Sequence, residues 1–153
     1  MSYLSPQEYL FHRSPMLLIE QVNEVTAESV SCSVALDSSL LHPFFTPQGL
    51  PSYLGIELMA QTVGIWSGYH DKCAGRAAAH GGLILSVRAY VASAAFFHLC
   101  STEPLNITMS MLMQERNYAS FEGSITQGPN TLATGRLSLC QFDANLERKL
   151  GFN

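Results

Sequence analysis

A largely apolar segment occupies residues 51–70, and its apolar residues lie on all sides of a helical wheel. This pattern is typical of a helix enclosed by protein. Pro51 favours a helix start there, because a proline at the first helical position gives up no hydrogen bond. Ala60, Gly64 and Gly68 form a stripe without bulk, so we expect another backbone segment to pack closely against it. The sequence therefore predicts a long core helix.

Alternating apolar and polar residues predict the strands of a sheet around this helix, since a period of two places one strand face on the core. Residues 16–22 are a mostly apolar run and are expected to form a first strand covered on both faces. The further expected strands are residues 29–36, 83–90, 105–113, 118–126 and 132–142. Residues 127–130 are typical of a hairpin turn, and residues 5–11 of a short helix. Residues 37–50 and 71–82 are expected to be irregular connections, residues 91–104 show no clear pattern, and residues 143–153 indicate a frayed helix or disorder. The prediction is one α+β domain over residues 1–153, with an antiparallel sheet curled around one helix.

The composition narrows the function classes. Apolar residues make up 47% of the 153 residues and charged residues 13%, which indicates a large buried fraction or a subunit interface. We therefore expect an oligomer, at least a dimer. A net charge of −4 without a Lys/Arg-rich run argues against nucleic-acid binding. The four cysteines lie far apart, without metal-ligand spacing, and are interpreted as reduced thiols.

Polar residues inside the apolar segment argue against a membrane span. Glu57 and Gln61 would both be costly in hydrocarbon. The first eight residues lack a basic region followed by an apolar one, so no secretory signal is expected. The sequence favours a cytoplasmic location.

Glu57 is the main candidate for chemistry, because a carboxylate in an apolar helix is costly unless protein or ligand groups meet it. One interpretation is a local hydrogen-bonded pair with Gln61, four residues further on. The other joins Glu57 to His42 in the preceding loop and to the free N–H groups of Ser52 and Tyr53 at the helix start. A histidine, a carboxyl group and an oxyanion donor suit proton abstraction beside a carbonyl.

Two motifs carry a resemblance to a known family. Residues 50–62, Leu-Pro-Ser-Tyr-Leu-Gly-Ile-Glu-Leu-Met-Ala-Gln-Thr, resemble the central helix of the hotdog-fold 3-hydroxyacyl-(acyl carrier protein) dehydratases. The similarity is greatest to the ApeP-like branch found with aryl-polyene pathways. Residues 12–19, His-Arg-Ser-Pro-Met-Leu-Leu-Ile, resemble the family's entry to its first strand. The resemblance implies a hotdog fold and the elimination of water from a 3-hydroxyacyl thioester on acyl carrier protein.

The resemblance also implies residue roles. His42 would take the Cα proton, Glu57 would protonate the leaving hydroxyl, and an N–H near Ser52 or Tyr53 would hold the thioester oxygen. Burial is expected to raise the pKa of Glu57 and so favour its acid role. The two acid–base groups would come from different subunits of a homodimer or heterodimer. No metal or organic cofactor is implied.

Several residues have a second interpretation. His42 is alternatively a structural loop residue. Gln61 and Arg88 are assigned to substrate binding; Arg88 would meet the acidic carrier protein or its phosphopantetheine, and otherwise lies on a solvated sheet face. His12 is interpreted as structural, at the boundary of an element. The remaining histidines are assigned to the surface or to loops: His70, His80 and His98.

Two alternative functions remain open at this level. One is an acyl-thioesterase in which Glu57 orients a water. The other is a non-catalytic hotdog subunit that completes the active site of a partner.

Overall fold

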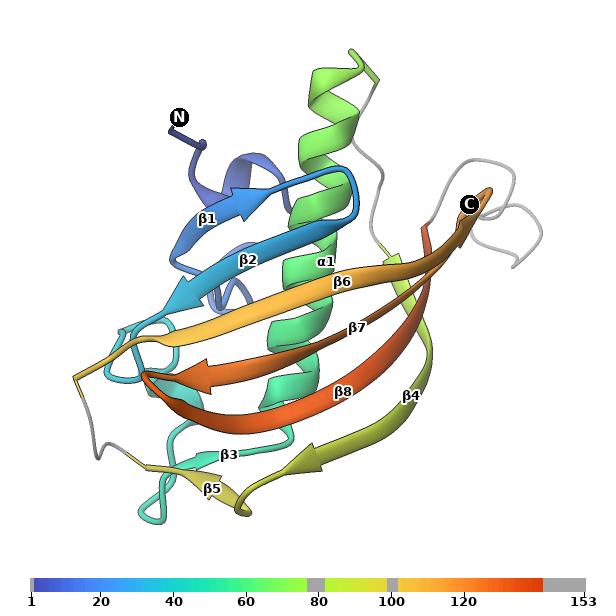
Figure 1. Cartoon of the computed structure of the whole chain (residues 1–153). Helices are drawn as coiled ribbons and strands as arrows, with labels where there is room; N and C mark the ends of the chain where they lie inside the picture. Colours follow the sequence, from blue (N-terminus) through green and yellow to red (C-terminus); the bar gives the residue numbers. More distant parts are fainter. Residues whose placement is uncertain (1, 77–81, 99–101, 142–153) are drawn as a thin grey trace, which may run out of the picture.

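One helix lies in the hollow of a curved antiparallel sheet (Figure 1). The computed structural model describes residues 2–76, 82–98 and 102–141. The six-stranded sheet has the order β1-β2-β6-β7-β8-β4, and a smaller sheet pairs β3 with β5. The elements are η1 (Pro6–Glu8), β1 (Gln21–Val25), β2 (Ser29–Val34), η2 (His42–Phe44), β3 (Leu50–Pro51), α1 (Leu54–Cys73), β4 (Gly82–Ala92), β5 (Phe96–Phe97), β6 (Leu105–Glu115), β7 (Tyr118–Gln127) and β8 (Asn130–Gln141). The expected α+β class is confirmed.

The start of the helix differs from its prediction. Pro51 is not the first helical residue; it belongs to β3 and pairs with Phe96. The helix begins later than predicted because the backbone of Ser52 is bound to other segments. Its N–H donates to the Ala95 carbonyl at 2.9 Å, and its carbonyl accepts the Tyr90 hydroxyl at 2.5 Å. These bonds hold Ser52 in the turn between β3 and α1, and the helix begins at Leu54.

The stripe of small residues on α1 does receive another backbone segment, as predicted. A Cβ atom on Gly68 would overlap the carbonyl group of Tyr9, and one on Gly64 would lie 2.8 Å from a methyl carbon of Leu10. The segment that follows η1 therefore packs directly onto the helix.

Four of the six expected strands are confirmed, as β4, β6, β7 and β8, and so is the hairpin turn between β7 and β8. The second expected strand corresponds to β2. The first is placed too early, because residues 16–20 lie outside the sheet and only Gln21 and Val22 of the predicted strand belong to β1. Leu18 is fully buried, but its N–H donates to the side chain of Gln61 rather than to a neighbouring strand.

Three smaller expectations had mixed outcomes. The short helix predicted at residues 5–11 is only the 3₁₀ turn η1, and residues 91–104 contain the short strand β5. The predicted connection at residues 71–82 starts later, because α1 continues to Cys73. The tail at residues 143–153 lies outside the described residues.

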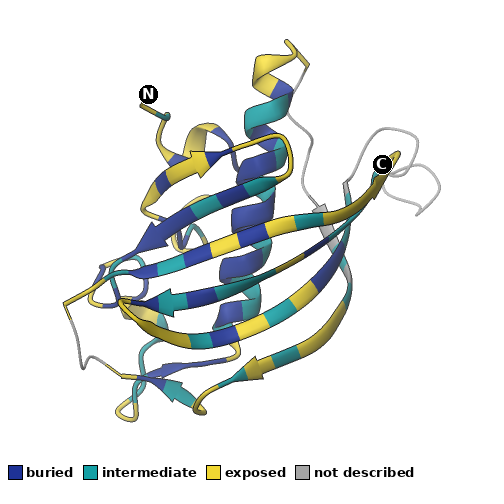
Figure 2. Ribbon diagram, viewed as in Figure 1, coloured by how far each residue is buried: buried dark blue, intermediate teal, exposed yellow. Residues whose placement is uncertain are grey.

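Burial alternates along the strands and is continuous on the helix side that faces them (Figure 2). Phe121, Leu137 and Ile107 project from the sheet into the core, where Leu58 and Ile65 of α1 are fully buried. Within the described part of the chain, no helix is long and apolar enough to cross a membrane. The core thus covers most of α1, and part of one side of the helix lies outside it.

Candidate active site

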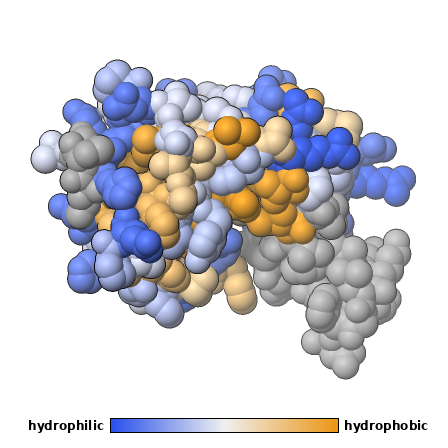
Figure 3. Space-filling view, turned by 90° about the horizontal axis from the view of Figure 1, so that it is seen from below, coloured by the Kyte–Doolittle hydropathy of each residue, from blue (hydrophilic) through white to orange (hydrophobic). Residues whose placement is uncertain are grey.

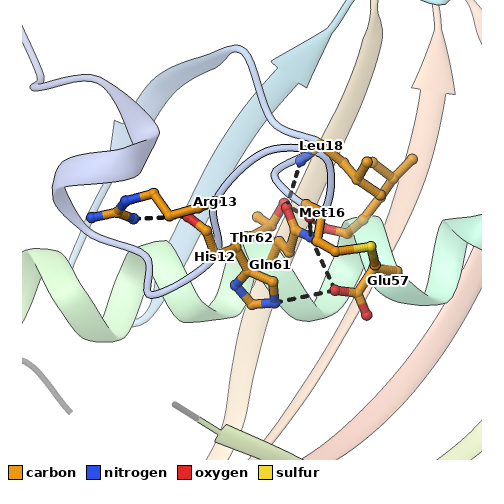
Figure 4. A network of polar contacts seen from close by, with 8 residues as sticks. His12, Arg13, Met16, Leu18, Glu57, Gln61 and Thr62 are labelled. Carbon is orange, nitrogen blue, oxygen red and sulfur yellow. Dashed lines mark hydrogen bonds and ion pairs between the residues drawn. The ribbon is translucent and has the colours of Figure 1, made fainter. Parts of the chain in front are cut away.

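Glu57 lies in the first turn of α1, next to a histidine from the N-terminal segment. The Nε2 atom of His12 is 3.3 Å from the Oε1 atom of Glu57, and Gln61 Nε2 donates to the same oxygen at 3.0 Å (Figure 4). The two ionisable side chains are partly exposed, at 37% for His12 and 31% for Glu57. The structure therefore pairs Glu57 with His12 and with Gln61.

Gln61 is fully engaged by its surroundings. Besides Glu57, its amide nitrogen donates to the Met16 carbonyl at 2.7 Å, and its oxygen accepts the Leu18 N–H at 2.9 Å. It is 1% exposed. The predicted pair with Glu57 is confirmed, and the remaining bonds show Gln61 as a clamp between α1 and residues 16–18.

The ionisation of Glu57 results from opposing effects. Burial raises the pKa of Glu57. Hydrogen bonds from His12 and Gln61, together with the charge of His12, lower this pKa by more than burial raises it, so the net shift is downward from the usual 4.5. The expectation of a raised pKa is thus wrong for this chain alone. The lowered pKa depends on the contact with His12, and the sequence does not predict this contact because the two residues are 45 positions apart.

A groove of about 410 Å³ opens beside the His12–Glu57 pair. It follows one side of α1 from Glu57 to Asp71, a distance of about 21 Å at 1.5 Å per residue. Most of its lining is apolar and includes the aromatic side chains of Trp66 and Phe121. A carboxylate at one end of a long apolar groove is an arrangement that can bind an acyl chain and present its polar end to an acid–base group.

The other expected site residues lie elsewhere. His42 is exposed in η2 and does not line the groove, so the structure does not bring it to Glu57 within the described chain. Arg88 is exposed on β4, where it faces Arg136 of β8 in the strand register. Both positions are open to solvent.

The proposed oxyanion donors are only partly available. The Ser52 N–H is bound to the Ala95 carbonyl, so the expectation that it is free is wrong. Tyr53 is the N-cap of α1 and is 68% exposed, and its N–H has no acceptor among the residues that the structure describes. Tyr53 therefore stays the candidate.

His12 is the site residue that the sequence interpretation missed. Its motif, residues 12–19, predicts the entry to a strand and a structural role for His12. The small-residue stripe on α1 was the useful signal, because the segment packed there carries His12.

Comparison with known structures defines the class of fold. The chain is similar to a thioesterase from Pseudomonas aeruginosa, with 12% identity, a TM-score of 0.53 and 79% coverage of both chains. It is also similar to the TT0310 protein of Thermus thermophilus, with 10% identity, a TM-score of 0.60 and coverage of 86% of this chain and 100% of that one. At these identities the likeness shows the fold alone, which is the hotdog fold.

The family is shown by closer matches. The model of the ApeP-like family, described as ApeP dehydratase, matches residues 4–150, so the chain belongs to the ApeP-like dehydratase family. It is also 36% identical to a chain of the dehydratase heterocomplex ApeI:P from Xenorhabdus doucetiae, with a TM-score of 0.90 and coverage of 97% of this chain and 99% of that one. The expected dehydratase function, a lyase activity, is thereby supported.

Proposed function

We propose that this dehydratase eliminates water from a 3-hydroxyacyl thioester carried by acyl carrier protein in the cytoplasm. The observation that carries the proposal is Glu57 at the end of the apolar groove. An acyl chain along α1 would bury apolar surface, and its hydroxyl-bearing carbon would stop beside the carboxyl group. Arg88, exposed on β4, is the proposed contact for the acidic carrier or its phosphate.

In the proposed reaction a base removes the Cα proton, and the electron pair left on Cα forms the double bond to Cβ. The C–O bond at Cβ breaks, and the hydroxyl leaves as water with a proton from Glu57. His42 is the proposed base, and the Tyr53 N–H the donor to the thioester oxygen. The proton taken by His42 returns to Glu57 through solvent, which completes the cycle.

A second subunit is part of this proposal. His42 is exposed and does not line the groove of its own chain, and we propose that it serves a site formed with a neighbouring subunit. Hydrophobic surface, orange in Figure 3, also gathers on the face seen from below. By analogy with the heterocomplex ApeI:P, we propose a heterodimer with a second hotdog subunit of the ApeI type.

Association would also favour the acid form of Glu57. Burial is the largest influence on the pKa of Glu57, and it acts upward. A partner and a substrate that cover the groove would remove more water from the 31% exposed side chain. The carboxyl group would then bind a proton more readily than it does in the isolated chain.

The test is turnover of a 3-hydroxyacyl group on acyl carrier protein, followed by mass spectrometry. The wild-type chain is assayed alone and after co-expression with the ApeI-type subunit of its own source. Glu57→Gln and His42→Ala are each expected to lower kcat about 10²- to 10⁴-fold. His98→Ala, an exposed histidine outside the groove, is the matched control.

The products separate the alternatives. Loss of water from the acyl group supports the proposal. Release of free carrier thiol would instead indicate a thioesterase. Unchanged turnover in the His42→Ala and Glu57→Gln complexes would mean that the partner subunit supplies both the catalytic acid and the catalytic base. This chain would then be a non-catalytic subunit.

A further inference from the structure

We propose that His12 is the positioning residue of the site: it holds the Oε1 atom of Glu57, so that Oε2 is the oxygen that meets the substrate. This inference rests on the proposed role of Glu57 and adds a residue to it. His12 acts through the carboxyl group rather than on the substrate itself.

The distribution of contacts on the carboxyl group is the first argument. His12 Nε2 and Gln61 Nε2 both approach Oε1, at 3.3 and 3.0 Å. Oε2 has no hydrogen-bond partner among the described residues, and Figure 4 shows it pointing away from both donors. One oxygen is therefore held while the other is available for proton transfer.

The second argument concerns the imidazole ring. Its Nδ1 atom is buried and has no hydrogen-bond partner in the described structure. The other ring nitrogen, Nε2, approaches Oε1 of Glu57 at 3.3 Å. A substrate in the groove would thus meet Oε2 of Glu57, while the imidazole ring of His12 holds Oε1 of the same carboxyl group.

The backbone around His12 is fixed on both sides. Before it, Tyr9 and Leu10 fit against Gly68 and Gly64 of α1. The Arg13 side chain donates to the Leu10 and His12 carbonyls, each at 2.8 Å.

After His12, Gln61 holds Met16 and Leu18. A surface ion pair with free side chains contributes little, but here the approach of His12 is set by packed backbone. The geometry is therefore a property of the fold.

Other charged or titratable groups in the groove are remote from this pair or make no described contact with it. Asp71 lies about 21 Å along α1 from Glu57. The strands and their turn contribute Arg116, Tyr118 and Cys140 to the lining. Among the described residues the influences on the Glu57 pKa, besides burial, are His12 and Gln61 alone.

The test follows Glu57 directly, without using activity. Chain labelled with ¹³C at glutamate carboxyl groups is titrated by NMR, with the Glu57 signal assigned by its loss in Glu57→Gln. We expect His12→Ala to move the Glu57 pKa upward and His12→Asn, which keeps a donor without a charge, to move it upward by less. His98→Ala, the control, should leave it unchanged.

A second readout separates positioning from simple folding. In the active complex we expect His12→Ala to lower kcat about 10- to 100-fold with little change in KM, because misplacement of a reacting group by about 1 Å has effects of this size. His12→Asn should restore part of the loss. It should also shift the alkaline limb of the pH–rate profile, where the acid Glu57 loses its proton, by less than His12→Ala does. Should His12→Ala fail to fold, His12→Asn carries both measurements.

The two proposals fail in different ways. An unchanged Glu57 pKa in both His12 variants would overturn the positioning role, whatever the activity. A wild-type complex that does not dehydrate the substrate would overturn the proposed function, while the titration would still report whether His12 governs the ionisation of Glu57.

Discussion

Gln61 shows how one polar side chain can hold a site together. It is buried in α1 and bonded to Met16, Leu18 and Glu57, so both its amide hydrogens and its oxygen have partners. Without it, the Leu18 N–H would be buried and unsatisfied. A buried group left in this state costs about 1–3 kcal/mol.

The first prediction concerns this clamp. Gln61→Ala is expected to lower the free energy of unfolding by about 3 kcal/mol, because it leaves a cavity as well as unpaired backbone groups. Urea denaturation followed by circular dichroism measures the change. Gln48→Ala, at an exposed loop position, should stay within about 0.5 kcal/mol of the wild type. A similar small change for Gln61→Ala would show that the clamp is not structural.

The second prediction concerns the stability that Glu57 contributes. Because its pKa is lowered in the folded chain, ionised Glu57 stabilises the fold fully above its usual pKa of 4.5, and this contribution is lost as pH falls through the lowered folded value. The side chain is partly exposed, so the effect should be at most about 1 kcal/mol. The stability difference between wild type and Glu57→Gln should therefore shrink between about pH 6 and about pH 3.

Thermal unfolding across this pH range measures the difference. The control variant is Glu24→Gln, which removes an exposed carboxylate on β1. A difference that stays constant, or that grows toward acid pH, would mean that the pKa of Glu57 is not lowered in the folded chain.

At the scale of elements, the local sequence pattern predicts the helices, strands and turns whose position depends on interactions between neighbours in sequence. The hairpin between β7 and β8 and the alternation in β6 depend on neighbours in sequence, and both were found. The helix start and the first strand depend on distant groups. The bonds of Ser52 to Ala95 and Tyr90, and of Leu18 to Gln61, override the signals from Pro51 and from the apolar run.

The contact between α1 and the N-terminal segment gives the third prediction. Alanine is the better helix former by about 1 kcal/mol, yet Gly68→Ala would place a methyl group on the Tyr9 backbone. We expect a net destabilisation of about 1–3 kcal/mol, because the segment has to move. The same displacement should weaken the hold of His12 on Glu57 and raise the Glu57 pKa.

Chemical denaturation and the carboxyl NMR titration together check this prediction. Lys72→Ala, at an exposed position of the same helix, should change neither quantity. A Gly68→Ala chain that is more stable than wild type would show that the segment adapts easily, and the proposed rigidity around His12 would then be wrong.

At the scale of the whole molecule, the sequence predicted one half of the site. Glu57 and Gln61 could be paired because their spacing on a helix is fixed. His12 reaches Glu57 only through tertiary packing, and no pattern in one sequence measures that. His42, closer in sequence to Glu57, lies outside the groove because η2 and β3 intervene before the helix.

The sheet edge formed by β4 gives the last prediction. β4 pairs with β8 on one side and with no strand of the described residues on the other. It exposes Val87 and Val91, the latter at 63%. An open apolar edge of this length invites pairing with another chain. We therefore expect β4 to form the subunit contact of the proposed dimer.

Val91→Lys is expected to weaken this association at least tenfold, since a charge at an edge strand disfavours strand pairing. Sedimentation velocity with the co-expressed subunit measures it. The control is Thr134→Lys, which adds the same charge at the register partner of Val91 on β8, an inner strand. Loss of the dimer in Val91→Lys alone would place the contact at the edge. Equal dissociation in both variants would assign the contact to the sheet face, and a dimer that survives both would place the partner on another surface and leave His42 without its proposed route to a second subunit's site.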